Sequence, residues 1–107
     1  MKRPAETPPK DVPAPVRKRV LLVDDNVDFA TSLAILFESL GHEVQVAHDG
    51  EQALAVVASF RPDFAFLDIG MPRMNGYDLA RRLRREPGAA HAVLVAVTGW
   101  GQEGDRQ

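Results

Sequence analysis

The sequence predicts a doubly wound α/β domain, in which a parallel sheet carries helices on both faces. Short runs that are apolar at every position recur along residues 19–107, as expected of strands covered on both faces. Segments with apolar residues at helical spacing separate these runs. The connections are short, and strand–helix–strand units of this kind make right-handed crossovers between parallel strands.

The chain length and composition indicate one small domain preceded by a tail. Residues 1–16 hold five of the eight prolines and almost no large apolar side chains. Residues 1–18 are therefore predicted to be a basic, proline-rich linker or disordered tail, and residues 19–107 the folded domain. The tail is basic, whereas residues 20–107 carry seven arginines against 13 acids. This acidic body disfavours nucleic acid as a direct partner.

Composition also excludes several classes of protein. The sequence contains no cysteine, which rules out disulfides, thiolate metal sites and cysteine catalysis. No apolar run approaches the roughly 18 residues of a membrane helix. No apolar segment follows the basic N-terminus, as one would in a signal peptide. The expected location is the cytoplasm, with no membrane partner.

The first predicted strand is the apolar run 20–23, which leads directly into Asp24. A helix is expected to follow, with Asn26 and Asp28 at its start, where capping side chains and negative charge are favourable. Gly41 lies where a helix C-cap favours glycine. The apolar residues at helical spacing between these ends are Phe29, Leu33, Leu36, Phe37 and Leu40.

The same alternation continues along the chain. Residues 44–47 are predicted to be a second strand, and residues 51–59 a short helix that an Arg-Pro pair ends. Residues 64–67 are predicted to be a third strand, which runs directly into Asp68.

A third helix and a fourth strand complete the predicted elements. Residues 77–85 are predicted to be a helix that ends before a Pro-Gly pair, and residues 93–97 a strand that runs into Thr98. The side chains of this helix that are expected to face inward are Tyr77, Ala80 and Leu83.

Oxygen-bearing side chains follow three of the four predicted strands. They are Asp24 and Asp25 after the first, Asp68 after the third and Thr98 after the fourth. Functional groups of such sheets gather at the carboxyl ends of the strands. If the first and third strands are neighbours, three carboxylates converge, and a cation must offset their repulsion. Mg²⁺ prefers such oxygens and often binds phosphate as well, so the spacing favours a metal site that handles phosphate. The alternative is that these acids are ordinary turn and cap residues.

Three segments resemble the receiver domain of two-component response regulators. They are Val20-Leu-Leu-Val-Asp-Asp-Asn26, Leu67-Asp68-Ile-Gly-Met-Pro72 with Met74-Asn75-Gly76, and Val97-Thr98. The resemblance covers roughly residues 19–105 and implies the flavodoxin-like receiver fold, with strand order 2-1-3-4. The Pro/Arg-rich spacer and the Thr-Gly-Trp-Gly segment resemble more closely the receivers of hybrid sensor kinases.

The resemblance implies a role for each matching residue. Asp68 would accept a phosphoryl group from a histidine kinase or a phosphotransfer domain, and Thr98 would contact that group and switch the adjoining surface. Asp25 and Asp68 would bind Mg²⁺ directly and Asp24 partly through water, with the main-chain carbonyl of Gly70 as a further ligand. The domain would be a signalling phosphoacceptor, not a turnover enzyme.

The sequence departs from the family pattern near its C-terminus. Receivers carry a lysine at the end of a fifth strand, whereas this sequence has no lysine after Lys18. The domain is therefore expected to be a C-terminally truncated receiver that lacks the fifth strand and the fifth helix. Residues 93–97 would then form an apolar edge strand, which favours self-association.

Three other functions fit parts of this pattern. A phosphorylation-independent docking module is favoured by the missing lysine and disfavoured by the three acids. A small Mg²⁺-dependent phosphohydrolase would place an acid two residues after its nucleophile. This sequence has Gly70 at that position, which disfavours the phosphohydrolase. A flavin or nucleotide binder would need a glycine-rich phosphate loop after the first strand, and none is present.

Two further groups of residues are expected to be ordinary surface. His42, His48 and His91 share no metal-ligand spacing and fall on predicted turns. Arg81, Arg82, Arg84 and Arg85 are expected to form the solvated face of a helix.

Overall fold

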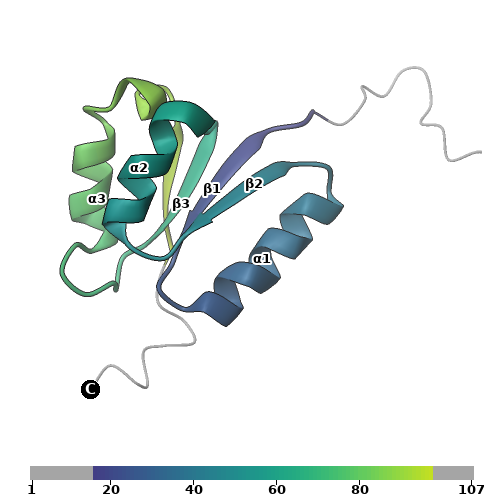
Figure 1. Ribbon diagram of the computed structural model, residues 1–107, viewed down its shortest axis with the longest axis horizontal. Coiled ribbons are helices and arrows are strands. Elements are labelled where there is room, and N and C mark those ends of the chain that lie inside the picture. The colour runs from purple at the N-terminus through teal and green to yellow at the C-terminus, as the bar shows by residue number, and fades with distance from the viewer. Residues whose placement is uncertain (1–15, 98–107) are drawn as a thin grey trace, which may run out of the picture.

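A computed structural model describes residues 16–97 as a four-stranded parallel sheet with helices on both faces (Figure 1). The strands are β1 (Arg19–Val23), β2 (Glu43–Ala47), β3 (Phe64–Asp68) and β4 (Val93–Val97). The helices are α1 (Val27–Ser39), α2 (Gly50–Phe60), α3 (Gly76–Leu83) and the short 3-10 helix η1 (Pro87–Ala89). The predicted fold class and the strand order 2-1-3-4 are confirmed. Thr98 and most of the predicted linker lie outside the described residues.

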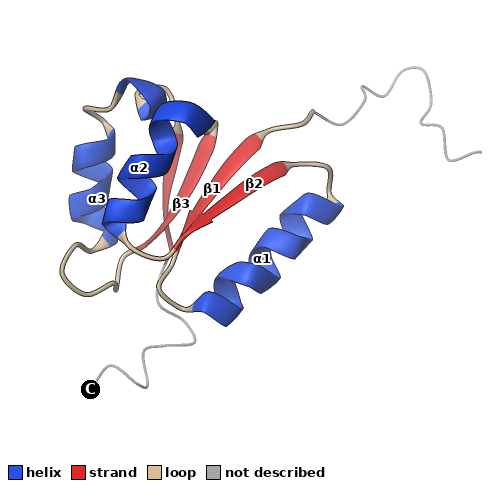
Figure 2. Cartoon of the chain, viewed as in Figure 1, coloured by secondary structure: helices blue, strands red, loops and turns tan. Residues whose placement is uncertain are grey.

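The helices are divided between the two faces of the sheet. α1 packs against β1 and β2, while α2 and α3 lie on the opposite face (Figures 1 and 2). β1 and β3 pair in parallel, with Val23 opposite Leu67, so their carboxyl ends lie side by side. This pairing brings together the residues that follow the two strands.

The sheet separates two apolar clusters. On the α2–α3 face, Leu21 and Leu67 pack with the buried Leu79 and Leu83. On the α1 face the buried cluster is smaller and includes Leu22. β1 contributes to both clusters, which is why it is apolar at every position from 20 to 23.

Side-chain caps begin all three α-helices soon after the preceding strand. Asn26, Asp49 and Asn75 are the N-caps of α1, α2 and α3. Each side chain accepts the backbone N–H three residues further on, at 2.8–3.0 Å. The predicted cap at Asn26 is confirmed. Because caps determine where a helix begins, these residues shape the loops at the carboxyl end of the sheet.

One side chain predicted to face inward in α3 does not. Tyr77 is 57% exposed, whereas Leu79 and Leu83 are fully buried. The buried stripe of α3 runs through Gly76, Leu79 and Leu83, at a spacing that leaves Tyr77 about a third of a turn away. Ala80 is partly buried against the same cluster.

α1 leaves much of its apolar stripe exposed. Phe29, Leu36 and the C-cap residue Leu40 are 42%, 52% and 58% exposed. Ala30 and Ala34 are the buried residues of α1, and Leu33 and Phe37 pack against the cluster on this face of the sheet. Phe29 and Leu33 lie beside Phe66 and Val97 of β3 and β4, and residues 16–97 include no second helix on this face of the sheet.

β4 is the edge strand, as predicted. All five of its residues are apolar, and Val93 is half exposed. Phe64 and Phe66 of β3 line a groove of about 270 Å³ on the α1 face.

The helices within residues 16–97 include none with the length and apolar character that a membrane span requires.

Candidate metal centre

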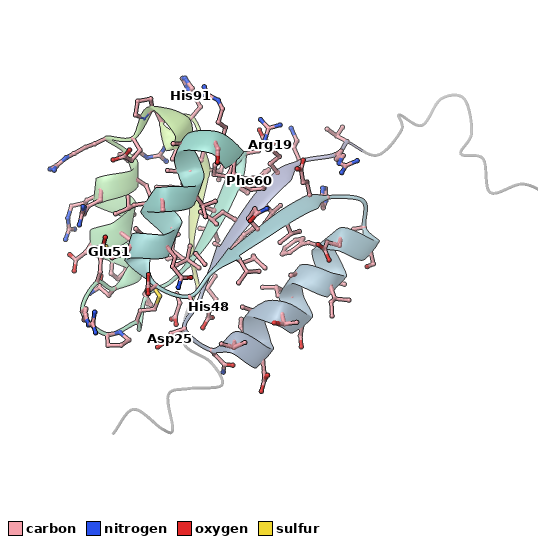
Figure 3. The ribbon with its side chains drawn as sticks, viewed as in Figure 1. Arg19, Asp25, His48, Glu51, Phe60 and His91 are labelled. Carbon is pink, nitrogen blue, oxygen red and sulfur yellow. The ribbon has the colours of Figure 1, made fainter. Side chains whose placement is uncertain are left out.

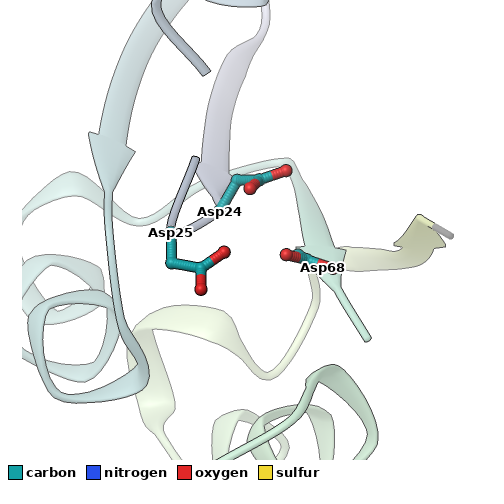
Figure 4. A group of neighbouring side chains, drawn as sticks. All are labelled: Asp24, Asp25 and Asp68. Atoms are coloured by element: carbon teal, nitrogen blue, oxygen red, sulfur yellow. The ribbon is translucent and has the colours of Figure 1, made fainter. Parts of the chain in front are cut away.

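Three carboxylates meet at the carboxyl end of the sheet (Figure 4). Asp24 and Asp25 follow β1, and Asp68 is the last residue of β3. One oxygen from each side chain lies within 4.8 Å of the others. Asp24 and Asp68 are 7% and 1% exposed, while Asp25 is open to solvent. The predicted convergence of these three acids is confirmed, and we call them the acid cluster.

The residues just after two of these acids hold the carboxylates in place. The Asn26 N–H donates to Oδ1 of Asp24 at 2.8 Å, and the Gly70 N–H donates to Oδ1 of Asp68 at 2.9 Å. In both turns the carboxylate binds the backbone two residues further on, which is common for aspartate. The bond also places Gly70, a predicted metal ligand through its carbonyl, beside Asp68.

The main chain of Asp24 is bonded both to β2 and to the turn that follows it. Its N–H donates to the carbonyl oxygen of Ala47 at 3.0 Å, and its carbonyl oxygen lies 3.0 Å from Nδ1 of His48. A carbonyl oxygen can only accept, so Nδ1 carries the hydrogen. His48 was expected to be an ordinary surface residue, but it is half buried and hydrogen-bonded to the site. Its partner lies 24 residues away, so no local sequence pattern indicates the contact.

A pocket of about 250 Å³ opens beside Asp25. The loops after β1, β2 and β3 line it, with His48, Glu51 and Arg73 among the charged or titratable side chains. Asp25 and His48 lie together at the carboxyl end of the sheet, and Arg19 and His91 at the opposite end (Figure 3). Arg73 has a φ of 69°, so the backbone turns sharply there. The pocket gives solvent and ligands a way to the exposed side of the acid cluster.

The donor set fits a hard divalent cation. Carboxylate oxygens are the ligands that Mg²⁺ prefers, and Mg²⁺ commonly uses one or two of them together with water and phosphate. Two of the three carboxylates are buried beside each other, where a cation would offset their repulsion. Among the predicted site residues, the structure brings together Asp24, Asp25, Asp68 and Gly70, and Thr98 lies outside the described residues.

Comparison with known proteins identifies the family. The family model of the response regulator receiver domain matches residues 20–107. The chain therefore belongs to the receiver domains of response regulators, which are signalling modules of two-component systems.

Curated relatives extend far beyond this chain. The DNA-binding response regulator MtrA of Mycobacterium tuberculosis (strain ATCC 25618 / H37Rv) is 41% identical over 83 residues, which are 78% of this chain and 36% of MtrA. The gliding motility regulatory protein of Myxococcus xanthus is 35% identical over 100 residues, which are 94% of this chain and 13% of that protein. The chain thus spans about a third of the length of MtrA.

Solved structures share the fold. The chemotaxis protein CheY4 of Vibrio cholerae has a TM-score of 0.71 at 27% identity, covering 76% of this chain and 68% of CheY4. The receiver domain of the sensor histidine kinase PA1611 from Pseudomonas aeruginosa PAO1 has a TM-score of 0.70 at 30% identity, covering 85% of this chain and 75% of that one. That structure has a magnesium ion coordinated in its active-site cleft.

Proposed function

We propose that this domain is a phosphoacceptor of a two-component phosphorelay, with Asp68 as the residue that is phosphorylated. The acid cluster is the observation that carries the proposal, because three carboxylates within 4.8 Å favour a divalent cation and phosphate together. The magnesium ion in the cleft of the PA1611 receiver supports the same cation here. The donor would be a phosphohistidine of a histidine kinase or a phosphotransfer domain.

Asp25 and Asp68 would hold Mg²⁺ directly, Asp24 partly through water, and Gly70 through its carbonyl. When bound, the cation would neutralise negative charge between the carboxylates and the phosphoryl oxygens. An oxygen of Asp68 forms the new bond to phosphorus while the bond from phosphorus to the histidine nitrogen breaks, and that nitrogen keeps the electron pair. The bond from the Gly70 N–H orients the carboxylate for this attack. Thr98 is proposed to contact the phosphoryl group and to switch a partner surface.

The proposed setting is a cytoplasmic signalling protein longer than this chain. The similarity to the receiver of a sensor histidine kinase supports an origin in a hybrid kinase. The acidic charge of residues 20–107 supports protein partners over nucleic acid for the domain itself.

The test is a two-dimensional amide NMR spectrum of the chain, without and with Mg²⁺ plus beryllofluoride, which mimics an aspartyl phosphate. We expect dispersed peaks that shift at Asp24, Asp25, Asp68 and Gly70. Acetyl phosphate with Mg²⁺ should also add one phosphoryl group to the intact mass.

Asp68→Asn should abolish both responses, and Asp28→Asn should abolish neither. Asp28 is a matched control because it is exposed in the first turn of α1 and is not part of the acid cluster. A well-dispersed wild-type spectrum that does not respond would instead support a docking module that works without phosphorylation. Labelling that survives in Asp68→Asn would show that another residue is the acceptor.

A further inference from the structure

His48 connects the first turn of α2 to the peptide between the two adjacent acids. The backbone N–H of His48 donates to Oε1 of Gln52 in α2 at 2.8 Å, which holds the backbone from which the ring projects. The ring then donates from Nδ1 to the carbonyl oxygen of Asp24 at 3.0 Å. A side chain on the β2–α2 turn is thereby coupled to the end of β1.

The orientation of this peptide affects Asp25 directly. The Asp24 carboxylate is buried and accepts the Asn26 N–H. Asp25 is exposed, and the peptide that carries the Asp24 carbonyl leads directly into its Cα. A bond that holds this carbonyl therefore restricts the direction in which the Asp25 side chain leaves the backbone.

We propose that His48 is a positioning residue that holds Asp25 in place to bind the cation, acting through the Asp24 carbonyl. This inference rests on the proposed function, because it assigns His48 to the same metal centre. Groups that orient metal ligands from outside the coordination sphere typically change metal affinity by about 10- to 100-fold when they are removed. His48 also lines the pocket that opens beside Asp25, so truncation of the His48 side chain would remove part of the pocket wall as well.

The chemistry of the bond provides a selective pair of variants. In His48→Asn the side-chain amide nitrogen takes the place of Nδ1 and can still donate, whereas in His48→Ala no donor remains. His42→Ala is the matched control. His42 lies directly before β2, at the other end of the sheet, and accepts the Lys18 N–H through its own Nδ1 at 3.1 Å.

The experiment is a Mg²⁺ titration of the full chain followed by amide NMR, paired with urea unfolding without metal. We expect His48→Ala to weaken Mg²⁺ binding about tenfold. His48→Asn should stay within about twofold of wild type, and His42→Ala should leave Mg²⁺ affinity unchanged.

Each outcome distinguishes this inference from the function on which it rests. If the wild-type chain is folded and does not bind Mg²⁺, the proposed function fails. If the wild type binds Mg²⁺ and His48→Ala binds it equally well, only the positioning role fails. If His48→Asn loses as much affinity as His48→Ala, the hydrogen bond is not the cause and the inference is overturned. A loss of urea stability in His48→Ala with unchanged Mg²⁺ affinity would assign His48 a purely structural role.

Discussion

Gly76, the first residue of α3, lies against the backbone of Asp68. A Cβ atom at Gly76 would fall 3.0 Å from the carbonyl oxygen of Asp68 and 3.0 Å from Cα of Ile69. These are main-chain atoms of the acid cluster and its loop, which cannot rotate away as a side chain would. The absence of a side chain at Gly76 thus lets α3 begin directly beneath the proposed phosphoacceptor.

We expect Gly76→Ala to disturb the metal centre. Relief of the contact requires the backbone of Asp68 or the start of α3 to move by a few tenths of an ångström. Overpacking of this kind typically costs about 1–3 kcal/mol of unfolding free energy. Urea unfolding should show a lower free energy of unfolding, and a Mg²⁺ titration should show a lower affinity for Mg²⁺.

Gly50→Ala is the matched control, because Gly50 is the first residue of α2. There the added Cβ would meet the Met74 sulfur at 2.6 Å. A thioether side chain has several rotatable bonds and can move aside. If Gly76→Ala and Gly50→Ala lower the unfolding free energy and the Mg²⁺ affinity equally, the close approach of Gly76 to a main chain is not the cause of its effect.

Asp25→Asn should weaken metal binding without lowering the stability of the metal-free domain. Without metal, the substitution removes one of three neighbouring negative charges, so the unfolding free energy should stay equal or rise slightly. Mg²⁺ affinity should fall at least tenfold because a proposed direct ligand is lost. Urea unfolding in EDTA and NMR titration with Mg²⁺ measure the two effects. Unchanged Mg²⁺ affinity would contradict the ligand role.

Arg84 is expected to stabilise the connection between α3 and β4. Its Nη1 donates to the carbonyl oxygens of Ala90 and Ala92 at 3.0 and 2.9 Å, although the arginines of this helix were expected to form a solvated face. Arg84→Met keeps the apolar stem and removes the donors, which should cost about 1 kcal/mol. Arg82→Met, an exposed change on the same helix, should have little effect. The prediction is wrong if the two variants unfold at the same urea concentration.

We predict that the chain self-associates through β4 and that Val93→Lys reduces this association. β4 is an apolar edge strand, and Val93 is 50% exposed, so a lysine there adds charge to the edge with little loss of core packing. Sedimentation velocity over a range of concentrations measures the effect. Ile35→Lys is the control, because Ile35 is 60% exposed on α1, which packs against β1 and β2. An equal reduction by both variants would mean that general surface apolarity, not the β4 edge, drives association.

The fold class and the acid cluster could be predicted from the sequence because both have local signatures. β1 is apolar at every position since it is buried on both faces, and acids directly after parallel strands lie at one end of the sheet. Knowledge of the order 2-1-3-4 then suffices to bring Asp24, Asp25 and Asp68 together.

Contacts between distant segments were decided only by the tertiary structure. The bond from His48 to Asp24 joins residues 24 apart, and the role of Gly76 depends on how closely α3 approaches β3. Periodicity identified α3, but it did not show that Tyr77 faces solvent while Leu79 is buried. The reason is physical. Periodicity reports which residues share a face of an element, while packing against the rest of the chain determines which face is covered and which backbone groups meet.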